Sequence, residues 1–264
     1  MNGIVVVTTD SGVKREFTNC LYEESGGKVD LVIVQRTPGK NFFKRVSNYV
    51  GKVGIVGLPR ELFFTLRWLF SRNVRNAEMV FSLRTGDSRY ARSWFPRTLM
   101  VESINTEKVR NEIFSLSPKL IVIWGGMIVK ENILNCAPKV INMHSGWCPE
   151  YRGVNGNQHA ILNNDWGHVG FTIHYAIEKV DAGGILEIVP ANTTKPTPEL
   201  FRDLNNRGES KYRDIALRLF HGEEIPSKPQ DVSRGKNYRL KEWTYEKKYK
   251  LGRLLLKRDS GSNF

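Results

Sequence analysis

Three side chains with complementary chemistry stand in order along the chain: an amide at Asn142, an imidazole at His144 and a carboxylate at Asp181. A neutral histidine beside a carboxylate can take a proton from an attacking amine, and an asparagine N–H can stabilise a developing oxyanion. The trio therefore predicts direct transfer of a small acyl group to nitrogen, with no covalent enzyme intermediate and no metal ion. Taken singly, His144 fits a loop cap and Asp181 fits an Asx turn. Only the joint spacing favours chemistry.

The elements expected around these residues are suited to bring them together. Residues 138–142 are typical of a short buried strand, and Asn142 and His144, two apart, would point to the same side of it. The end of such a strand is the usual place for chemistry in an open α/β sheet. Asp181 lies in a glycine-rich turn that follows the β-rich run at residues 170–175, where His174 is expected to support it.

The fold class follows from alternating strand and helix patterns. Residues 4–8 predict a strand, residues 13–24 a helix and residues 29–35 a second strand, which together make a βαβ unit. The continuously apolar run at residues 119–124 is typical of a central parallel strand. We therefore expect an α/β, Rossmann-like, mostly parallel sheet flanked by helices. Further patterns predict helices at residues 107–116 and 197–220 and a β-hairpin from residues 170–175 and 184–189.

A helix is also expected at residues 58–69, because its apolar residues fall on one helical stripe. We interpret this stripe as core packing; it consists of Leu62, Phe63, Leu66, Leu69 and Phe70. Residues 36–56 are basic without clear periodicity and indicate either a surface insertion or a contact with an anionic substrate. Residues 74–93 give no assignable pattern.

Length and composition fit a globular enzyme. The chain has 264 residues, of which 40% are hydrophobic and 25% are charged. We predict a catalytic domain over residues 1–190 and a C-terminal helix with a basic extension over residues 191–264, which could serve a homodimer. No membrane helix and no signal peptide are expected, and three scattered cysteines indicate free thiols, so the expected location is the cytoplasm. Cys148, near the presumed site, is interpreted as a packing residue and not as a nucleophile.

The formal net charge of +13 points to an anionic partner. Much of the excess lies between residues 236 and 258, where lysines and arginines alternate with Tyr238, Trp243, Tyr245 and Tyr249. Such a mixture can bind a nucleic-acid backbone and stack bases, although it is also typical of a solvated basic flank. A phosphorylated small molecule would equally favour a positive cleft.

The pattern Asn142-x-His144, the loop from Pro149 to Gly153, and Gly170-x-Thr172-x-His174 followed by Asp181 resembles the folate-dependent formyltransferases. The resemblance is strong over residues 117–189, looser before that and weak after Pro198. It implies that N10-formyltetrahydrofolate donates the one-carbon group and that Asn142, His144 and Asp181 are the catalytic trio. It also implies two walls for the pterin ring: Gly125, Gly126, Met127 and Ile128 on one side, and Ile177, Glu178 and Val180 on the other.

The class of acceptor is predicted by analogy with that family, from the arrangement of domains along the chain. A catalytic domain with a short C-terminal extension is most similar to the sugar N-formyltransferases, so the expected acceptor is a nucleoside-diphosphate-linked amino sugar. Its expected contacts are Thr9, Asp10, Tyr151 and Arg152. Three alternatives stay open: an enzyme similar to methionyl-tRNA formyltransferase, a non-catalytic nucleic-acid-binding protein on this fold, and a hydrolase that releases formate. The basic extension keeps a nucleic-acid partner open, and no membrane insertion is expected.

Overall fold

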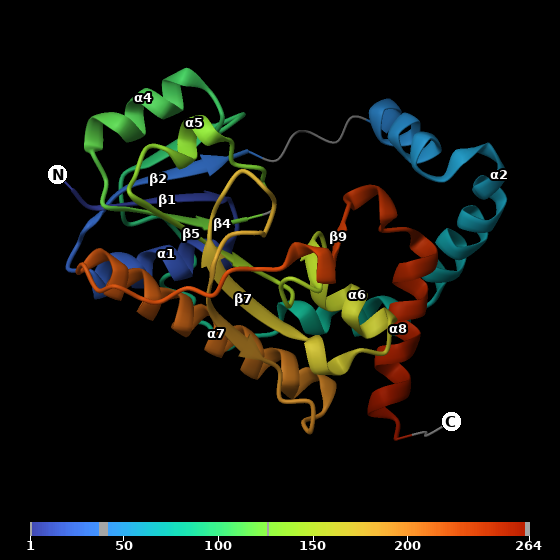
Figure 1. Cartoon of the computed structure of the whole chain (residues 1–264). Helices are drawn as coiled ribbons and strands as arrows, with labels where there is room; N and C mark the ends of the chain where they lie inside the picture. The colour runs from blue at the N-terminus through green and yellow to red at the C-terminus, as the bar shows by residue number, and fades with distance from the viewer. Residues whose placement is uncertain (1, 37–41, 126, 262–264) are drawn as a thin grey trace.

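The computed structural model describes residues 2–36, 42–125 and 127–261, without the side chains of residues 42–50, 52, 53 and 55. These residues form a seven-stranded sheet in the order β3-β2-β1-β4-β5-β7-β8 (Figure 1). Its strands are β1 (Ile4–Thr9), β2 (Val29–Gln35), β3 (Thr98–Val101), β4 (Leu120–Trp124), β5 (Lys139–His144), β7 (Gly170–Tyr175) and β8 (Ile185–Pro190). The first five are parallel, and β7 and β8 join as antiparallel strands. The predicted mostly parallel α/β sheet is confirmed.

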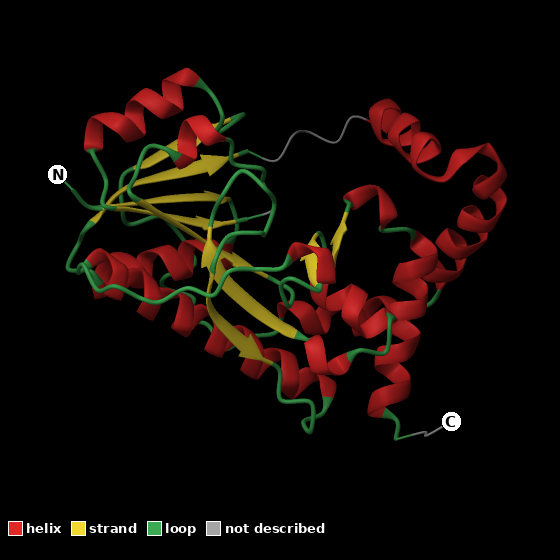
Figure 2. Ribbon diagram, in the orientation of Figure 1, coloured by secondary structure: helices red, strands yellow, loops and turns green. Residues whose placement is uncertain are grey.

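Helices cover both faces of the sheet (Figure 2). On one face lie α1 (Gly12–Glu24) and α7 (Thr197–Phe220), and on the other lie α4 (Glu107–Leu116) and α5 (Glu131–Leu134). The remaining helices are α2 (Phe42–Phe70), α3 (Arg72–Ala77), α6 (Gly156–Leu162) and α8 (Tyr245–Asp259). Short 3₁₀ segments occupy Glu78–Ser82, Trp166–His168, Val232–Arg234 and Leu240–Glu242, and β6 (Tyr151–Gly153) pairs with β9 (Lys236–Tyr238).

The central strands explain why the sheet forms. β1, β2 and β4 are rich in valine and isoleucine and are buried on both faces, as parallel strands under two helical layers must be. Alternate residues of each strand therefore lie in two separate hydrophobic cores, one on each face of the sheet. Val6, Val32 and Val122 pack toward the layer that contains α1 and α7, while Val5, Ile33 and Ile121 lie in the other core.

The strand order reverses between β1 and β4, and open α/β sheets have a ligand-binding crevice at such a switch point. From β1 the chain runs outward to β2 and β3, and after β4 it runs the other way to β5. Helices after neighbouring strands therefore diverge at the carboxyl ends of β1 and β4, which is where open α/β sheets bind their ligands. The residues that follow β1, β4 and β5 are consequently the ones placed to meet a ligand.

Helix α7 is tied into the sheet although it follows the predicted boundary at residue 190. The buried hydroxyl of Tyr212 donates to the carbonyl oxygens of Ile123, at 2.7 Å, and Ile141, at 3.0 Å. Its ring stacks on Phe17 of α1 with a centroid separation of 5.3 Å. Residues on both sides of the boundary thus share one core. The division into two domains stays a prediction.

Helix α2 departs from the sequence-based expectation in two ways. It begins at Phe42, inside the basic segment for which no element was expected, with non-helical backbone at Gly54. The apolar stripe predicted to lie in the core is exposed instead, with 59% of Leu62, 52% of Phe63, 46% of Leu66, 44% of Leu69 and 85% of Phe70 accessible. The prediction was wrong because helical periodicity shows that a face is apolar but not what covers it. Among the described residues, no helix is long and apolar enough to cross a bilayer.

Candidate active site

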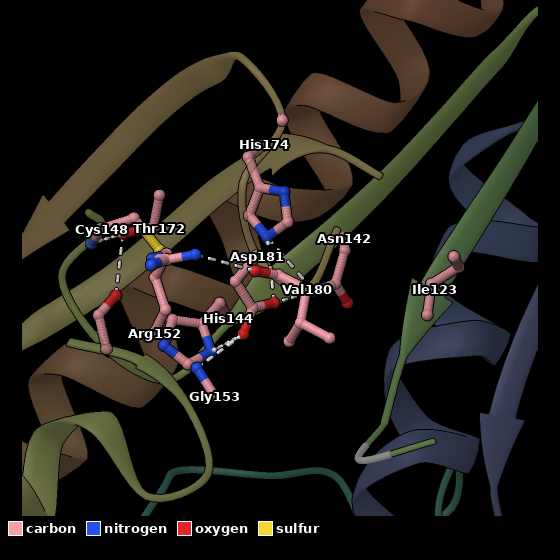
Figure 3. Close-up of polar contacts among 12 residues, drawn as sticks. Ile123, Asn142, His144, Cys148, Arg152, Gly153, Thr172, His174, Val180 and Asp181 are labelled. Carbon is pink, nitrogen blue, oxygen red and sulfur yellow. Dashed lines mark hydrogen bonds and ion pairs between the residues drawn. The ribbon is translucent and has the colours of Figure 1, made fainter. Parts of the chain in front are cut away.

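The predicted trio converges at the carboxyl end of β5 (Figure 3). The Oδ2 atom of Asp181 lies 3.3 Å from Nδ1 of His144, and its Oδ1 atom accepts from Nδ2 of Asn142 at 3.3 Å. His174 joins them, with its Nε2 atom 3.4 Å from Asp181 Oδ1 and 3.3 Å from Asn142 Nδ2. The backbone N–H of Gly153 donates to Asp181 Oδ2 at 2.9 Å. Four separate segments of the chain thus meet around one carboxylate.

Strand pairing sets the positions of the polar side chains. β5 and β7 are antiparallel, so Asn142 stands directly opposite His174 and His144 opposite Thr172. Asp181 reaches the same point from the loop after β7, where its backbone is left-handed with φ of 48°. Aspartate tolerates this conformation better than most residues, which explains its place in the turn.

The loop before β6 orients His144. The carbonyl oxygen of Tyr151 accepts a hydrogen bond from His144 Nε2 at 2.7 Å. A carbonyl can only accept, so this contact places a proton on Nε2 and directs Nδ1 at the carboxylate of Asp181. The imidazole is therefore held in one orientation, with its second nitrogen beside a stabilising negative charge.

The same loop needs glycine at position 153. The φ of Gly153 is +84°, and a side-chain Cβ at this position would come within 2.3 Å of the carbonyl oxygen of Tyr238. This close approach belongs to the pairing of β6 with β9, in which Arg152 and Asn237 are partners. The C-terminal extension is thus fastened directly onto the loop that orients His144 and supplies the N–H to Asp181.

Asp181 is ionised in this setting. Burial by itself raises the pKa of its carboxyl, but the neighbouring His144 and His174 and the Gly153 N–H outweigh it and hold that pKa well below the ordinary aspartate range. A buried carboxylate with several donors is suited to stabilise a protonated imidazole. It is not suited to donate a proton at neutral pH.

The amide of Asn142 is turned opposite to its predicted orientation. Its Nδ2 atom faces Asp181 and His174, whereas its buried Oδ1 atom has no hydrogen-bond partner among the described residues. An unpaired buried acceptor is uncommon and calls for an explanation. As placed, the group offers an acceptor to a ligand and not the N–H donor expected for an oxyanion.

The residues expected to bind the folate surround the end of β4 and the loop before Asp181. Gly125 directly follows β4, Met127 is half-buried, and Ile128 and Ile177 are 66% and 48% exposed. Glu178 is exposed and Val180 is half-buried, its carbonyl oxygen accepting from Arg152. Gly126 lies outside the described residues. Exposed apolar side chains with a glycine backbone nearby fit a flat heterocycle, so these residues suit the predicted donor.

The four residues expected to bind the acceptor fall into two groups. Thr9 and Asp10 lie at the end of β1, beside the crevice, where Asp10 pairs with Arg15. Tyr151 and Arg152 are buried and make structural contacts: the Tyr151 hydroxyl donates to Asp165 at 2.8 Å, and Arg152 donates to the carbonyl of Val232 at 3.2 Å. Contact of these two side chains with an acceptor stays a prediction.

Sequence reasoning missed Lys14, which stands at the crevice. Its Nζ atom donates to Thr9 Oγ1 at 2.6 Å, and a Cβ built on Gly125 would lie 3.3 Å from it, so it bridges the ends of β1 and β4. Burial lowers the pKa of this ammonium to about 8. No ion pair of Lys14 occurs with a carboxylate in the described part of the chain. Lysine in the first turn of a helix is an unremarkable signal in sequence, and only the fold reveals it.

His159 and Cys148 both serve in packing. His159 stacks on the Tyr238 ring at 3.9 Å, and burial lowers its pKa to about 4, so it is a neutral packing residue. Cys148 is buried, and burial together with the charge of Asp181 raises the pKa of its thiol far above the ordinary range. A thiol held neutral is a poor nucleophile, which agrees with the packing interpretation.

The fold and the polar cluster together indicate the class of protein. Residues 88–209, which include the whole polar cluster, match the formyl transferase family model. The resemblance of this region to the folate-dependent formyltransferases is confirmed.

Comparison with individual proteins adds detail at two levels. Over 139 residues the chain is 32% identical to methionyl-tRNA formyltransferase of Limosilactobacillus fermentum, a match that covers 51% of this chain and 43% of that protein. The chain thus spans less than half the length of this curated relative.

Among solved structures, similarity of fold extends over nearly the whole chain. A sugar N-formyltransferase from Shewanella sp. superposes with a TM-score of 0.57 at 16% identity, covering 96% of this chain and 88% of the other. The N-formyltransferase of Helicobacter canadensis, solved with folinic acid and dTDP-3-aminofucose, gives 0.55 at 16% identity, with coverage of 95% and 79%.

Proposed function

We propose that this protein is a cytoplasmic N-formyltransferase that moves a formyl group from N10-formyltetrahydrofolate to the amino group of a nucleoside-diphosphate-linked amino sugar. The observation that carries the reaction type is the buried cluster of Asn142, His144 and Asp181 within a formyl transferase domain. The folate supplies the formyl group. Its fit to the site is supported by the exposed apolar residues beside Gly125 and by the unpaired Oδ1 atom of Asn142.

In the proposed mechanism, Asn142 positions the acceptor amine. Its Oδ1 atom accepts an amine N–H, which directs the nitrogen lone pair away from the amide and toward the formyl carbon. Rotation of the amide about its Cβ–Cγ bond, a soft torsion, would instead present Nδ2 to the developing oxyanion. The second arrangement is the role expected from the sequence.

His144 then takes the proton that the amine loses as its nitrogen bonds to the formyl carbon, and it can return that proton to the folate nitrogen when the bond from N10 to the formyl carbon breaks. The bond from Nε2 to the Tyr151 carbonyl leaves the lone pair on Nδ1, so Nδ1 is the basic atom. The ionised Asp181, 3.3 Å away, stabilises the imidazolium that forms. His174 donates from Nδ1 to the Tyr175 carbonyl at 2.8 Å and thereby keeps its Nε2 atom directed at the Asn142 amide. His174 thus acts by positioning Asn142.

The acceptor class is supported by layout and by charge. The Shewanella sugar N-formyltransferase and the Helicobacter canadensis N-formyltransferase, which was solved with a dTDP-linked amino sugar, match 96% and 95% of this chain in fold. A diphosphate would meet a positive group in the crevice, since Lys14 stands there with no carboxylate partner among the described residues. We propose that Lys14, together with Thr9, faces the anionic part of the acceptor.

A second acceptor, methionyl-tRNA, is favoured by a sequence relative and by the charge of the chain. The curated relative with 32% identity is a methionyl-tRNA formyltransferase, and the formal charge of +13 suits a nucleic acid. The match covers 51% of this chain and 43% of that protein, so more than half of the relative has no counterpart in it.

One experiment tests donor and acceptor together. The protein is incubated with N10-formyltetrahydrofolate and either a panel of dTDP-, GDP- and UDP-linked amino sugars or methionyl-tRNA, and products are identified by mass spectrometry. A formamide on one nucleotide sugar supports the proposal. A formylated tRNA with no sugar product overturns the choice of acceptor. Formate release without any acceptor would indicate a hydrolase, and tRNA binding without turnover a non-catalytic protein.

A further inference from the structure

The apolar stripe of α2 is exposed in a position that the protein itself does not cover. Leu62, Leu66 and Leu69 follow one another at helical spacing, with Phe63 and Phe70 beside them, and each is between 44% and 85% exposed. Leaving several large apolar side chains of one helix in water is costly, and contiguous exposed patches mark interaction surfaces. The helix lies at the far side of the molecule from α4 and α5 (Figure 1).

The opposite face of α2 is already occupied by α8. Phe64 packs against Tyr249 with a centroid distance of 5.9 Å, and Trp68 meets Tyr245 at 5.4 Å. The buried carboxylate of Glu61 accepts from the backbone N–H groups of Tyr245 and Glu246, at the start of α8. Because this face anchors the helix, the exposed stripe is a second, separate apolar surface.

The stripe leads into a groove at the end of α2. This groove has a volume of about 1120 Å³ and is lined on its apolar side by Phe70, Leu254 and Leu256. Arg72, Lys250 and Arg253 line it as well. Apolar and cationic side chains therefore line the groove together, and Phe70 belongs to both the groove and the stripe; we call the stripe and the groove, formed by α2, α3 and α8, the α2–α8 face.

The charge on this face is of one sign. Among the described side chains of α2 and α3, four are arginines (Arg60, Arg67, Arg72 and Arg75) and one is acidic, Glu61, which is buried. On α8, Glu246 is neutralised between Arg60 and Lys250, each at 2.7 Å. The other carboxylate of α8, Asp259, accepts from the N–H of Thr197. The face consequently offers apolar contact within a positive field.

We propose that the α2–α8 face docks on an anionic lipid bilayer, with the α2 stripe in the interface and the basic residues at the headgroups. Charge complementarity decides between occupants. A second copy of this chain would bring the same positive charge, and a nucleic acid would gain nothing from leucine and phenylalanine. Helices that combine an apolar stripe with lysines and arginines lie in the plane of anionic membranes. α2 has this composition, and it is not apolar enough to span a bilayer.

Vesicle sedimentation tests the proposal on the whole 264-residue chain without reference to its activity. The protein is mixed with phosphatidylcholine vesicles, with or without about 30 mol% phosphatidylglycerol, at salt concentrations from about 0.05 to about 0.5 M. We expect sedimentation with the anionic vesicles, a loss of binding at high salt and little binding to neutral vesicles. Protein that stays in solution with anionic vesicles overturns the proposal.

Two double variants and one control variant test which surface of the protein binds the vesicles. Leu66→Ser with Phe70→Ser removes apolar contact and is expected to weaken binding by about tenfold or more. Arg72→Gln with Arg253→Gln is expected to weaken it by roughly fivefold for each charge removed. Phe114→Ser is the matched control, because Phe114 is 62% exposed on α4 under Arg110. It should bind as the wild type does.

Three further outcomes contradict the proposal. Serine variants that bind as strongly as the wild type would place the lipid contact elsewhere. Equal binding to neutral vesicles would remove the role of charge. A wild-type dimer that the paired Leu66 and Phe70 substitutions convert to a monomer, with no vesicle binding, would identify the occupant as a second copy. Light scattering on the same samples measures that outcome.

Discussion

The polar cluster at the end of β5 contains buried polar side chains, whereas the α2–α8 face contains exposed apolar side chains. At the cluster, His144, His174 and Asp181 are at most 10% exposed, yet all three side chains are held by hydrogen bonds or ion pairs. On the α2–α8 face, leucine and phenylalanine side chains lie in water. Buried polar groups and exposed apolar groups both cost free energy, and proteins keep them mainly where they serve a function.

The comparison shows where rigidity is concentrated. Four segments meet at the cluster, and the C-terminal extension holds one of them through the pairing of β6 with β9, so His144 and Asp181 are each held in one orientation. In the described part of the chain, the helix that carries the exposed stripe is held through its opposite side, by Phe64 and Trp68. Changes in the first region should therefore alter chemistry, and changes in the second should alter association while stability is kept.

The largest effect is expected from loss of the imidazole at the cluster. His144→Ala should lower kcat by about 10²–10⁴-fold, because the proton acceptor is removed. His168→Ala is the matched control, since His168 also pairs with an aspartate, Asp165, at 2.8 Å but lies outside the cluster. Steady-state kinetics with the formyl donor and the identified acceptor measure both. Near-normal turnover of the His144 variant would contradict the assigned role.

The next effect concerns stability of the scaffold that carries the cluster. Tyr212→Phe leaves the buried carbonyls of Ile123 and Ile141 without their donor and should cost about 1–3 kcal/mol in free energy of unfolding. Urea denaturation followed by circular dichroism measures this loss. Tyr22→Phe, a half-buried tyrosine of α1, should change stability by less than about 0.5 kcal/mol. Equal effects of the two would mean that α7 is not secured through these bonds.

A smaller, pH-dependent effect is expected at Lys14. Its charged form attracts an anion, and its pKa is about 8, so KM for a phosphorylated acceptor should rise as pH increases through about 8. The sign follows from loss of the positive charge on deprotonation. Lys14→Met should raise KM by roughly tenfold at pH 7 and remove the pH dependence, with a smaller change in kcat. An unchanged profile in this variant would assign the titration to another group.

The smallest effect is expected for stability on the exposed stripe. Leu66→Ser should change the free energy of unfolding by about 0.5 kcal/mol or less, because the side chain is largely in water. Phe64→Ala, on the anchored face of the same helix, should cost about 2 kcal/mol or more through lost packing on Tyr249. Thermal or urea unfolding distinguishes them. Equal losses would show that the stripe is covered in solution.

Prediction from sequence succeeded where local pattern and long-range packing coincide. The runs that became β1, β2 and β4 are apolar and β-branched, so only a buried parallel strand suits them. Asn142 and His144 share a strand end, and the order of motifs around them already indicated that Asp181 would join them. The stripe of α2, by contrast, has the periodicity of a core helix and lies exposed.

The sequence by itself determined the alternating elements, the identity of the polar trio and its place at the end of a strand. Tertiary structure decided the rest: which nitrogen of His144 faces Asp181, which atom of Asn142 is left unpaired, that Lys14 stands at the crevice, and which face of α2 is covered. The physical reason is that periodicity and turn chemistry act between neighbours along the chain. Partners and burial are set by segments distant in sequence, and these become neighbours only when the sheet and the C-terminal extension assemble.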